Sequence, residues 1–292
     1  MKKITIAIVV VIIIVLGIYY FGKDSSEPAP VTPEPTINQP ATTTATTTPQ
    51  QNPGETVIGK SVEGNDIVAY NFGTGPKKLL FVGGIHGGYS SNTVAVAMEA
   101  VDAFKADPTM VPSGLSVTII PVLNPDGFKK IAGYNIDPPA SVLTSARFNG
   151  NDVDLNRNFD CDWQTKAKWQ SKTVSGGSAA FSEPESLAIK NYIETAKPTA
   201  VVVWYSAAGG VFASNCHGGV STETNTLTKT FATASGYPAH SSFDFYTTTG
   251  DMTNWLAKIG VPAISVLLTN HTDTEWSKNE KGIKALLEYY SK

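Results

Sequence analysis

The chain has 292 residues, of which 41% are hydrophobic and 16% charged, and its formal net charge at pH 7 is −3. This composition excludes a disordered chain or a low-complexity array, because it supplies enough apolar side chains for a folded core. It also argues against a nucleic-acid partner, since a protein that binds nucleic acid usually presents a strongly basic surface.

An apolar segment at the N-terminus predicts a membrane anchor. Lys2 and Lys3 precede residues 4–22, which carry no charge, and a helix of that length would span roughly 28 Å, close to the hydrocarbon thickness of a bilayer. The lysines favour a cytoplasmic N-terminus. We therefore expect a single-pass protein of the cell membrane whose C-terminal domain lies outside the cytoplasm. Cleavage of the segment as a signal peptide, followed by secretion, is the alternative.

The composition changes after the apolar segment. Residues 24–54 are rich in Pro and Thr and nearly lack large apolar side chains, so we expect them to form an extended linker. The chain is thereby divided into an anchor at residues 1–23, with a transmembrane helix at about 4–22, a linker at 24–54 and one domain at 55–292.

Apolar patterns within the domain predict strands that alternate with helices. In chain order, the predicted elements are a hairpin around residues 63–65, a strand at 78–82, a helix at 92–105, a strand at 115–122, a helix at 184–196, a strand at 199–204, helices at 222–235 and 250–259, a strand at 262–268 and a helix at 277–290. Ser182 is expected to cap the helix that begins at Pro184, with Glu185 completing a capping box. The alternation predicts a three-layer α/β/α fold around a mixed, mostly parallel sheet.

The chain has two cysteines, Cys161 and Cys216. Outside the cytoplasm, the redox conditions permit a disulfide between them. Two buried thiols are the alternative, and the sequence does not decide between the two states.

Six motifs stand out along the domain, and four of them lie where a predicted strand ends. They are GGIHGGYSSNT (83–93), NPDG (124–127), RFNGNDVDLNRNFD (147–160), SGGSAAFSEPES (175–186), WYSAAGG (204–210) and a last one that runs from YTTTG to TDTE (246–275). In this order and spacing they resemble the zinc metallocarboxypeptidase family, of the carboxypeptidase A and B type, across roughly residues 55–290. The resemblance implies a zinc ion held by two histidines and a glutamate, a further glutamate as general base, and a subsite for the terminal carboxylate of a peptide.

The metal and base positions of the family are mostly substituted in this chain. His86 matches the first metal ligand, but Ser90 stands where the glutamate is expected and Tyr205 where the second histidine is expected. A neutral hydroxyl is a poor zinc ligand, and a phenol with a pKa near ~10 stays protonated at neutral pH. Leu267 stands at the position of the general base and accepts no proton. The family therefore implies zinc, whereas these residues indicate a degraded site with little or no metal. Relocated ligands would have to come from Cys216, His217, His240 or His271.

The carboxylate-binding positions of the family are better retained. By the resemblance, the substrate-binding residues are Arg147, Asn156, Arg157 and Tyr246. Arginine binds a carboxylate through two parallel hydrogen bonds, which suits it to hold the end of a peptide chain. The alternative for Arg157 is a buried structural ion pair with Asp154 or Asp160.

Three functions follow from this pattern. The first is a catalytically impaired carboxypeptidase-like domain that binds peptide or protein C-termini, with cell-wall peptides among the candidate partners. The second is an active metallocarboxypeptidase that uses non-standard metal ligands. The third is a protein-interaction domain at the cell surface.

Overall fold

The computed structural model describes residues 54–134 and 138–292. The predicted anchor at 4–22 and almost all of the predicted linker lie outside these residues, so both stay predictions. Within the two described ranges, no helix has both the length and the apolar character needed to cross a bilayer.

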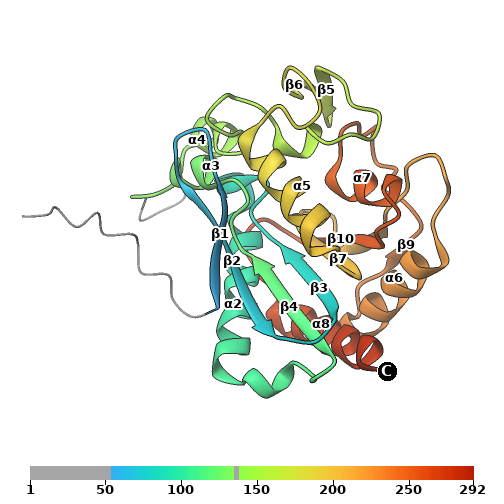
Figure 1. The fold of residues 1–292 in the computed structure, drawn as a ribbon. Helices are drawn as coiled ribbons and strands as arrows, with labels where there is room; N and C mark the ends of the chain where they lie inside the picture. The colour runs from blue at the N-terminus through green and yellow to red at the C-terminus, as the bar shows by residue number, and fades with distance from the viewer. Residues whose placement is uncertain (1–53, 135–137) are drawn as a thin grey trace, which may run out of the picture. The chain divides into compact units, whose positions relative to one another are not determined.

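One mixed sheet of eight strands organises the domain (Figure 1). Its order is β1-β2-β4-β3-β7-β10-β8-β9. The strands are β1 (Glu55–Lys60), β2 (Asp66–Gly73), β3 (Lys77–Val82), β4 (Leu115–Ile120), β7 (Ala200–Ser206), β8 (Gly210–Ala213), β9 (Ala239–His240) and β10 (Ala263–Leu268). The central strands β4, β3, β7 and β10 are parallel, whereas β1, β2 and β8 pair antiparallel with their inner neighbours. The predicted mixed sheet is confirmed, and the carboxyl ends of β3, β7 and β10 meet at one edge.

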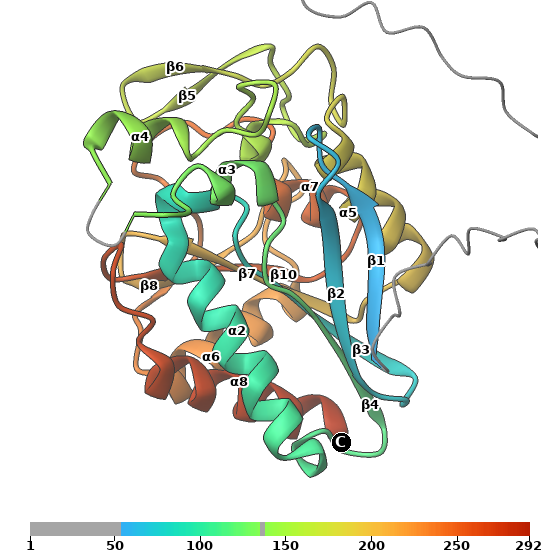
Figure 2. The same ribbon diagram turned by 90° about the vertical axis from the view of Figure 1, so that its left-hand side faces the viewer.

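Helices cover both faces of the sheet, as Figures 1 and 2 show. One face carries α2 (Ser91–Ala106), α6 (Thr222–Ser235) and α8 (Trp276–Ser291), and the other carries α5 (Pro184–Ala196) and α7 (Met252–Lys258). The shorter elements are η1 (Gly87–Ser90), η2 (Pro108–Met110), α3 (Pro125–Lys129), α4 (Ala140–Ser145), η3 (Leu155–Arg157) and a separate hairpin of β5 (Lys166–Trp169) and β6 (Lys172–Ser175). The sequence predicted the large elements, but not β5, β6, β8 or β9.

Strand alternation places the functional positions on one face of the sheet. Side chains on a strand point alternately to opposite faces. On β7, Val202 and Trp204 pack under α2, α6 and α8, whereas Val203 and Tyr205 face the layer of α5 and α7. Leu267 lies opposite Tyr205 in the parallel register of β10 and β7 and faces the same way.

The predicted cap of α5 is wrong. The N-cap residue is Glu183, and its side chain caps no backbone N–H group of the helix. The Ser182 hydroxyl instead donates to the Glu183 carboxylate at 2.8 Å. Glu185 accepts a hydrogen bond from the Val62 backbone at 3.1 Å, so it joins the helix to the β1–β2 turn and closes no capping box.

Cys161 and Cys216 form a disulfide, with their Cα atoms 6.1 Å apart. Of the two states that the sequence left open, the structure has the bridge. It joins the segment after η3 to the segment after β8, across a sequence separation of 55 residues.

We expect the paired change Cys161→Ala and Cys216→Ala to lower the free energy of unfolding by about 4 kcal/mol, because the bridge restricts the unfolded chain over a long loop. Urea unfolding of the oxidised protein and of the variant measures the difference. Reduction of the unchanged protein serves as the control and is expected to cause a similar loss. Equal stability of the oxidised protein and the variant would contradict this role.

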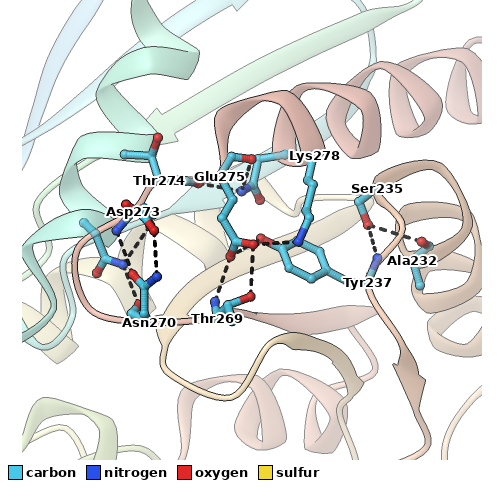
Figure 3. Close-up of polar contacts among 11 residues, drawn as sticks. Ala232, Ser235, Tyr237, Thr269, Asn270, Asp273, Thr274, Glu275 and Lys278 are labelled. Carbon is cyan, nitrogen blue, oxygen red and sulfur yellow. Dashed lines mark hydrogen bonds and ion pairs between the residues drawn. The ribbon is translucent and has the colours of Figure 1, made fainter.

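A compact network holds the segment between β10 and α8 (Figure 3). Glu275 accepts hydrogen bonds from the backbone and hydroxyl of Thr269, from the Tyr237 hydroxyl and from Lys278. Burial opposes ionisation of Glu275, but these hydrogen bonds outweigh it and lower its pKa to about 2. Burial and the neighbouring carboxylate raise the pKa of Tyr237.

The change Glu275→Gln is expected to lower the free energy of unfolding at pH 7 by about 1–3 kcal/mol, because it removes charge-assisted hydrogen bonds. Because the pKa of Glu275 is lowered in the fold, its ionised carboxylate contributes its full stabilisation above the unfolded pKa near 4.5. This stabilisation is lost as the pH falls toward about 2. The difference in the free energy of unfolding between the parent protein and Glu275→Gln should therefore become smaller as the pH falls through that range. Urea unfolding across pH measures it, with Glu280→Gln, which breaks the exposed pair with Lys284 on the same helix, as a control that should change stability little. A difference that stays constant with pH would contradict the assignment.

Candidate functional site

A cavity of about 270 Å³ lies at the carboxyl ends of β3, β7 and β10. Its walls bring together seven of the eight positions that the sequence singled out, since Ser90 does not line it. The seven are His86, Arg147, Asn156, Arg157, Tyr205, Tyr246 and Leu267.

His86 sits on a tight loop that follows β3. Gly84 and Gly87 flank it with φ values of +63° and +48°, and a Cβ on Gly87 would lie 2.6 Å from the Ala146 carbonyl oxygen, so the loop requires glycine there. The His86 side chain is buried and neither ring nitrogen has a hydrogen bond within the described chain; Nε2 lies 3.8 Å from Asp154 Oδ1. Burial, and after it the positive charge of Arg147, holds the pKa of His86 well below its usual value. The imidazole is therefore neutral at pH 7.

The Tyr205 hydroxyl is already hydrogen-bonded within the protein. Its hydroxyl donates to Asn156 Oδ1 at 3.1 Å. Burial, and after it the charge of Asp251, raises the pKa of Tyr205 well above its usual value, so the phenol stays protonated. A protonated phenol that already donates a hydrogen bond does not serve as a zinc ligand.

The residues around His86 do not fit the zinc ion that the family implies. Ser90 is fully buried and offers only an unpartnered hydroxyl, and Leu267 offers no polar atom. Across residues 54–134 and 138–292 there is no group of three His, Cys, Asp or Glu side chains placed to hold a metal. One neutral imidazole does not replace the three-ligand set of a catalytic zinc site.

The candidate relocated ligands do not rebuild the site. Cys216 is in the disulfide, the exposed His217 pairs with Asp162 at 2.7 Å, and the His240 ring stacks on Phe212 with the centroids 4.4 Å apart. His271 alone of the four lines the cavity. Burial and the charge of Arg147 lower the pKa of His271, so it too is neutral at pH 7.

Arg147 presents an open guanidinium to the cavity. Its Nε donates to Asp154 Oδ2 at 2.9 Å, and its guanidinium carbon lies 4.5 Å from the centre of the Trp169 ring. The Asn124 side chain of the NPDG motif fixes the Arg147 backbone by donating to its carbonyl at 3.2 Å. The two terminal nitrogens of Arg147 have no hydrogen-bond partner in the described part of the chain, so they can bind a carboxylate through two parallel bonds.

Arg157 is the second buried cation of the cavity. Its Nε donates to the Lys168 carbonyl at 2.8 Å and one terminal nitrogen donates to the Asn156 carbonyl. Neither proposed ion pair forms, because Asp154 pairs with Arg147 and Asp160 pairs with Lys258 at 2.9 Å. Arg157 forms no ion pair with any described carboxylate.

The two arginines are the only ones in the whole sequence, and both are buried in this cavity. Burial lowers the pKa of Arg147; the charge of Asp154 opposes this shift and the charge of Arg157 adds to it, so the two arginines lie close enough to repel each other. A guanidinium stays protonated in proteins. The cavity thus holds two buried cations beside neutral imidazoles, together with the carboxylate of Asp251, which accepts a hydrogen bond from Asn156.

Asn156 and Tyr246 reach the cavity with less freedom than the arginines. Asn156 Nδ2 donates to Asp251 Oδ2 at 2.8 Å, and its Oδ1 also accepts from the Met252 backbone at 3.1 Å, so one amide hydrogen remains for a ligand. The Tyr246 ring packs edge-on against Phe243 at 5.1 Å between ring centroids. Its hydroxyl has no hydrogen bond to any described residue.

The aromatic wall of the cavity was not predicted from the sequence. Trp169 and Tyr89 pack edge-on with their centroids 4.9 Å apart, and Arg147 lies over both rings. Trp169 ends strand β5, in which buried Ala167 and Trp169 alternate with exposed lysines. This alternation in the sequence could have predicted a strand with Trp169 on its buried face. Tyr89 belongs to the motif at residues 83–93, but nothing in the sequence pointed to its neighbours in the fold.

The chain belongs to the zinc carboxypeptidase family, whose model matches residues 44–285. It is 26% identical over 200 residues to the carboxypeptidase N catalytic chain of Homo sapiens, which covers 64% of this chain and 40% of that protein. It is 25% identical over 177 residues to carboxypeptidase M of Mus musculus, which covers 56% of this chain and 33% of that protein. The chain thus matches less than half of the length of these relatives.

Solved structures share the fold at low sequence identity. The murein-tripeptide amidase of Escherichia coli O157 matches with a TM-score of 0.61 and 22% identity, over 81% of this chain and 92% of that one. Bovine thrombin-activatable fibrinolysis inhibitor, solved with a tick carboxypeptidase inhibitor, matches with a TM-score of 0.62 and 17% identity, over 81% and 88%. These similarities establish the carboxypeptidase-like α/β fold.

Proposed function

We propose that this domain binds the C-terminal carboxylate of a peptide and does not hydrolyse it. The observation that carries the proposal is the pair of buried guanidinium groups, Arg147 and Arg157, in a cavity where only one of them has an ion-pair partner. Burial of an unpaired cation is costly, and a carboxylate that binds both would offset this cost. A peptide end supplies such a carboxylate.

The absence of hydrolysis follows from the groups that face the same cavity. Cleavage of a peptide bond by water needs a base and a group that polarises the carbonyl. Leu267 supplies no base, and Tyr205 is a protonated phenol in place of a metal ligand. The two arginines that could bind a carboxylate line this cavity, whereas the positions expected to hold a metal ligand and the base carry a phenol and an apolar side chain.

The setting that we propose is the outer face of a membrane. The uncharged segment at residues 4–22 supports an anchor, and the Cys161–Cys216 disulfide fits an oxidising compartment outside the cytoplasm. Peptide ends of secreted proteins and of the cell wall would be within reach there. Secretion after cleavage of the segment would place the domain in the same compartment.

Calorimetric titration with a peptide and its C-terminal amide tests the proposal. The free acid should bind at least tenfold more tightly, since charge-assisted hydrogen bonds contribute about 1.5–3 kcal/mol and ~1.4 kcal/mol is a tenfold change. The titration uses a panel of peptides that differ in their terminal residue, so that it covers apolar, polar and charged side chains. Equal affinity for acid and amide across the panel would overturn the proposal.

A further inference from the structure

Three side chains beside the cavity form a chain of hydrogen bonds that the carboxylate site does not use. Asn92 on α2 is buried, Ser206 ends β7, and His271 lies between β10 and α8. Ser206 Oγ is 3.2 Å from Asn92 Oδ1 and 3.0 Å from His271 Nδ1. Ser206 and His271 both line the cavity.

The direction of each hydrogen bond follows from Asn92. Its Nδ2 donates to the carbonyl oxygens of Asn270 at 2.8 Å and Asp273 at 3.1 Å, so its Oδ1 faces Ser206. Because Oδ1 only accepts, the Ser206 hydroxyl donates to it, and Ser206 Oγ then accepts from Nδ1–H of His271. A neutral imidazole that carries its proton on Nδ1 has an accepting lone pair on Nε2.

This arrangement excludes an activated serine and leaves an acceptor at the cavity. The Ser206 proton points away from His271, so the pair lacks the donor–acceptor order of a nucleophile and its base. His271 Nε2 has no hydrogen-bond partner among the residues that the structure describes, although the ring lines the cavity.

The acceptor lies near the carboxylate site and on a fixed segment. The His271 ring packs on the Tyr89 ring with the centroids 4.9 Å apart. The Arg147 guanidinium lies 5.7 Å from the centre of the Tyr89 ring. The hydrogen bonds among Thr269, Asn270, Asp273 and Glu275 hold the segment that carries His271 (Figure 3). Both groups contact the Tyr89 ring, so their separation is no more than roughly three extended residues at about 3.3–3.6 Å per residue, and a peptide held at Arg147 can reach His271 with its last few residues.

We propose that Nε2 of His271 accepts a hydrogen bond from one of the last two backbone N–H groups of the bound peptide. The inference rests on the proposed function and adds a second recognised feature, the peptide bond itself. The cavity would then select peptide ends over other carboxylic acids. Asn92 and Ser206 are positioning residues, because they act only through the ring of His271.

Ester analogues of a binding peptide test this inference. In each analogue, an ester oxygen replaces one of the last two backbone N–H groups, which removes the donor and keeps the length and the terminal carboxylate. The parent protein should bind the peptide about fivefold more tightly than one of the two esters. His271→Leu should bind peptide and ester equally, whereas His271→Gln, which retains an accepting oxygen, should keep most of the difference. Ser206→Ala should reduce it.

His217→Asn is the matched control, because it changes a histidine outside the cavity walls and asparagine tolerates its positive φ of 62°. It should keep the fivefold difference. If the parent protein binds the peptide and both esters equally but prefers acid over amide, the role of His271 is wrong and the proposed function stands. If His271→Leu is folded and still prefers the peptide, the role is also wrong. If the parent does not prefer acid over amide, the proposed function itself fails. Should His271→Leu fail to fold, the parent and His271→Gln decide.

Discussion

Replacement of Arg147 by lysine is expected to weaken binding of a free-acid peptide at least tenfold and to change binding of its amide little. Lysine keeps a positive charge for the buried carboxylate of Asp154, so the fold is not left with an unpaired anion. Lysine lacks the planar guanidinium group, which can bind a carboxylate through two parallel hydrogen bonds and which packs on Trp169. Calorimetric titration of both peptide forms measures the change.

Lys258→Met provides the control for this variant. It removes one positive charge in an exposed ion pair with Asp160 and lies outside the cavity walls. The preference for the free acid should persist in this control. Loss of the preference in both variants would mean that the net charge of the domain attracts the acid, and an unchanged preference in Arg147→Lys would remove Arg147 from the binding site.

We expect the second large effect, a gain of zinc binding, when the metal ligands of the family are restored. Ser90→Glu with Tyr205→His should raise zinc affinity from negligible to micromolar or tighter, roughly a thousandfold or more, since three ligands would then surround the site. Turnover should require Leu267→Glu in addition, because water activation needs a base. Zinc content and hydrolysis of a blocked dipeptide measure the two steps.

Leu267→Glu alone is the control for the restored site. It should bind no zinc and cleave no peptide, and it should be neutral or destabilising, because it buries a carboxylate beside Tyr205. A folded double variant without zinc affinity would show that the backbone around His86 has also changed. Zinc binding at full stoichiometry in the unchanged protein would contradict the account of the lost ligands.

The larger elements were predictable because their apolar periodicity is strong. The strand at 78–82 and the helices at 184–196 and 222–235 agree with the structure to within a residue or two. Strands β8 and β9 have four residues and two residues, too few to show a period of their own. Their place in the sheet depends on pairing with distant strands, which local sequence does not reveal.

The positions at the site were predictable, but their pairing was not. The motifs led to His86, Tyr205 and Leu267, and strand topology explains why the three meet at one edge of the sheet. The partner of Asp154 was not predictable, because both arginines lie within a few residues of it in the chain. The structure pairs Asp154 with Arg147 and leaves Arg157 with backbone carbonyls.

The measurement that tests the central claim most directly is the affinity of the unchanged protein for a free-acid peptide, first with a chelator and then with added zinc. Binding through Arg147 and Arg157 requires no metal, so the affinity should be the same in both solutions and the peptide should remain intact. Loss of binding in the chelator would contradict the claim by showing that a metal takes part in binding. Release of the terminal residue with zinc would contradict it by identifying an active metallocarboxypeptidase.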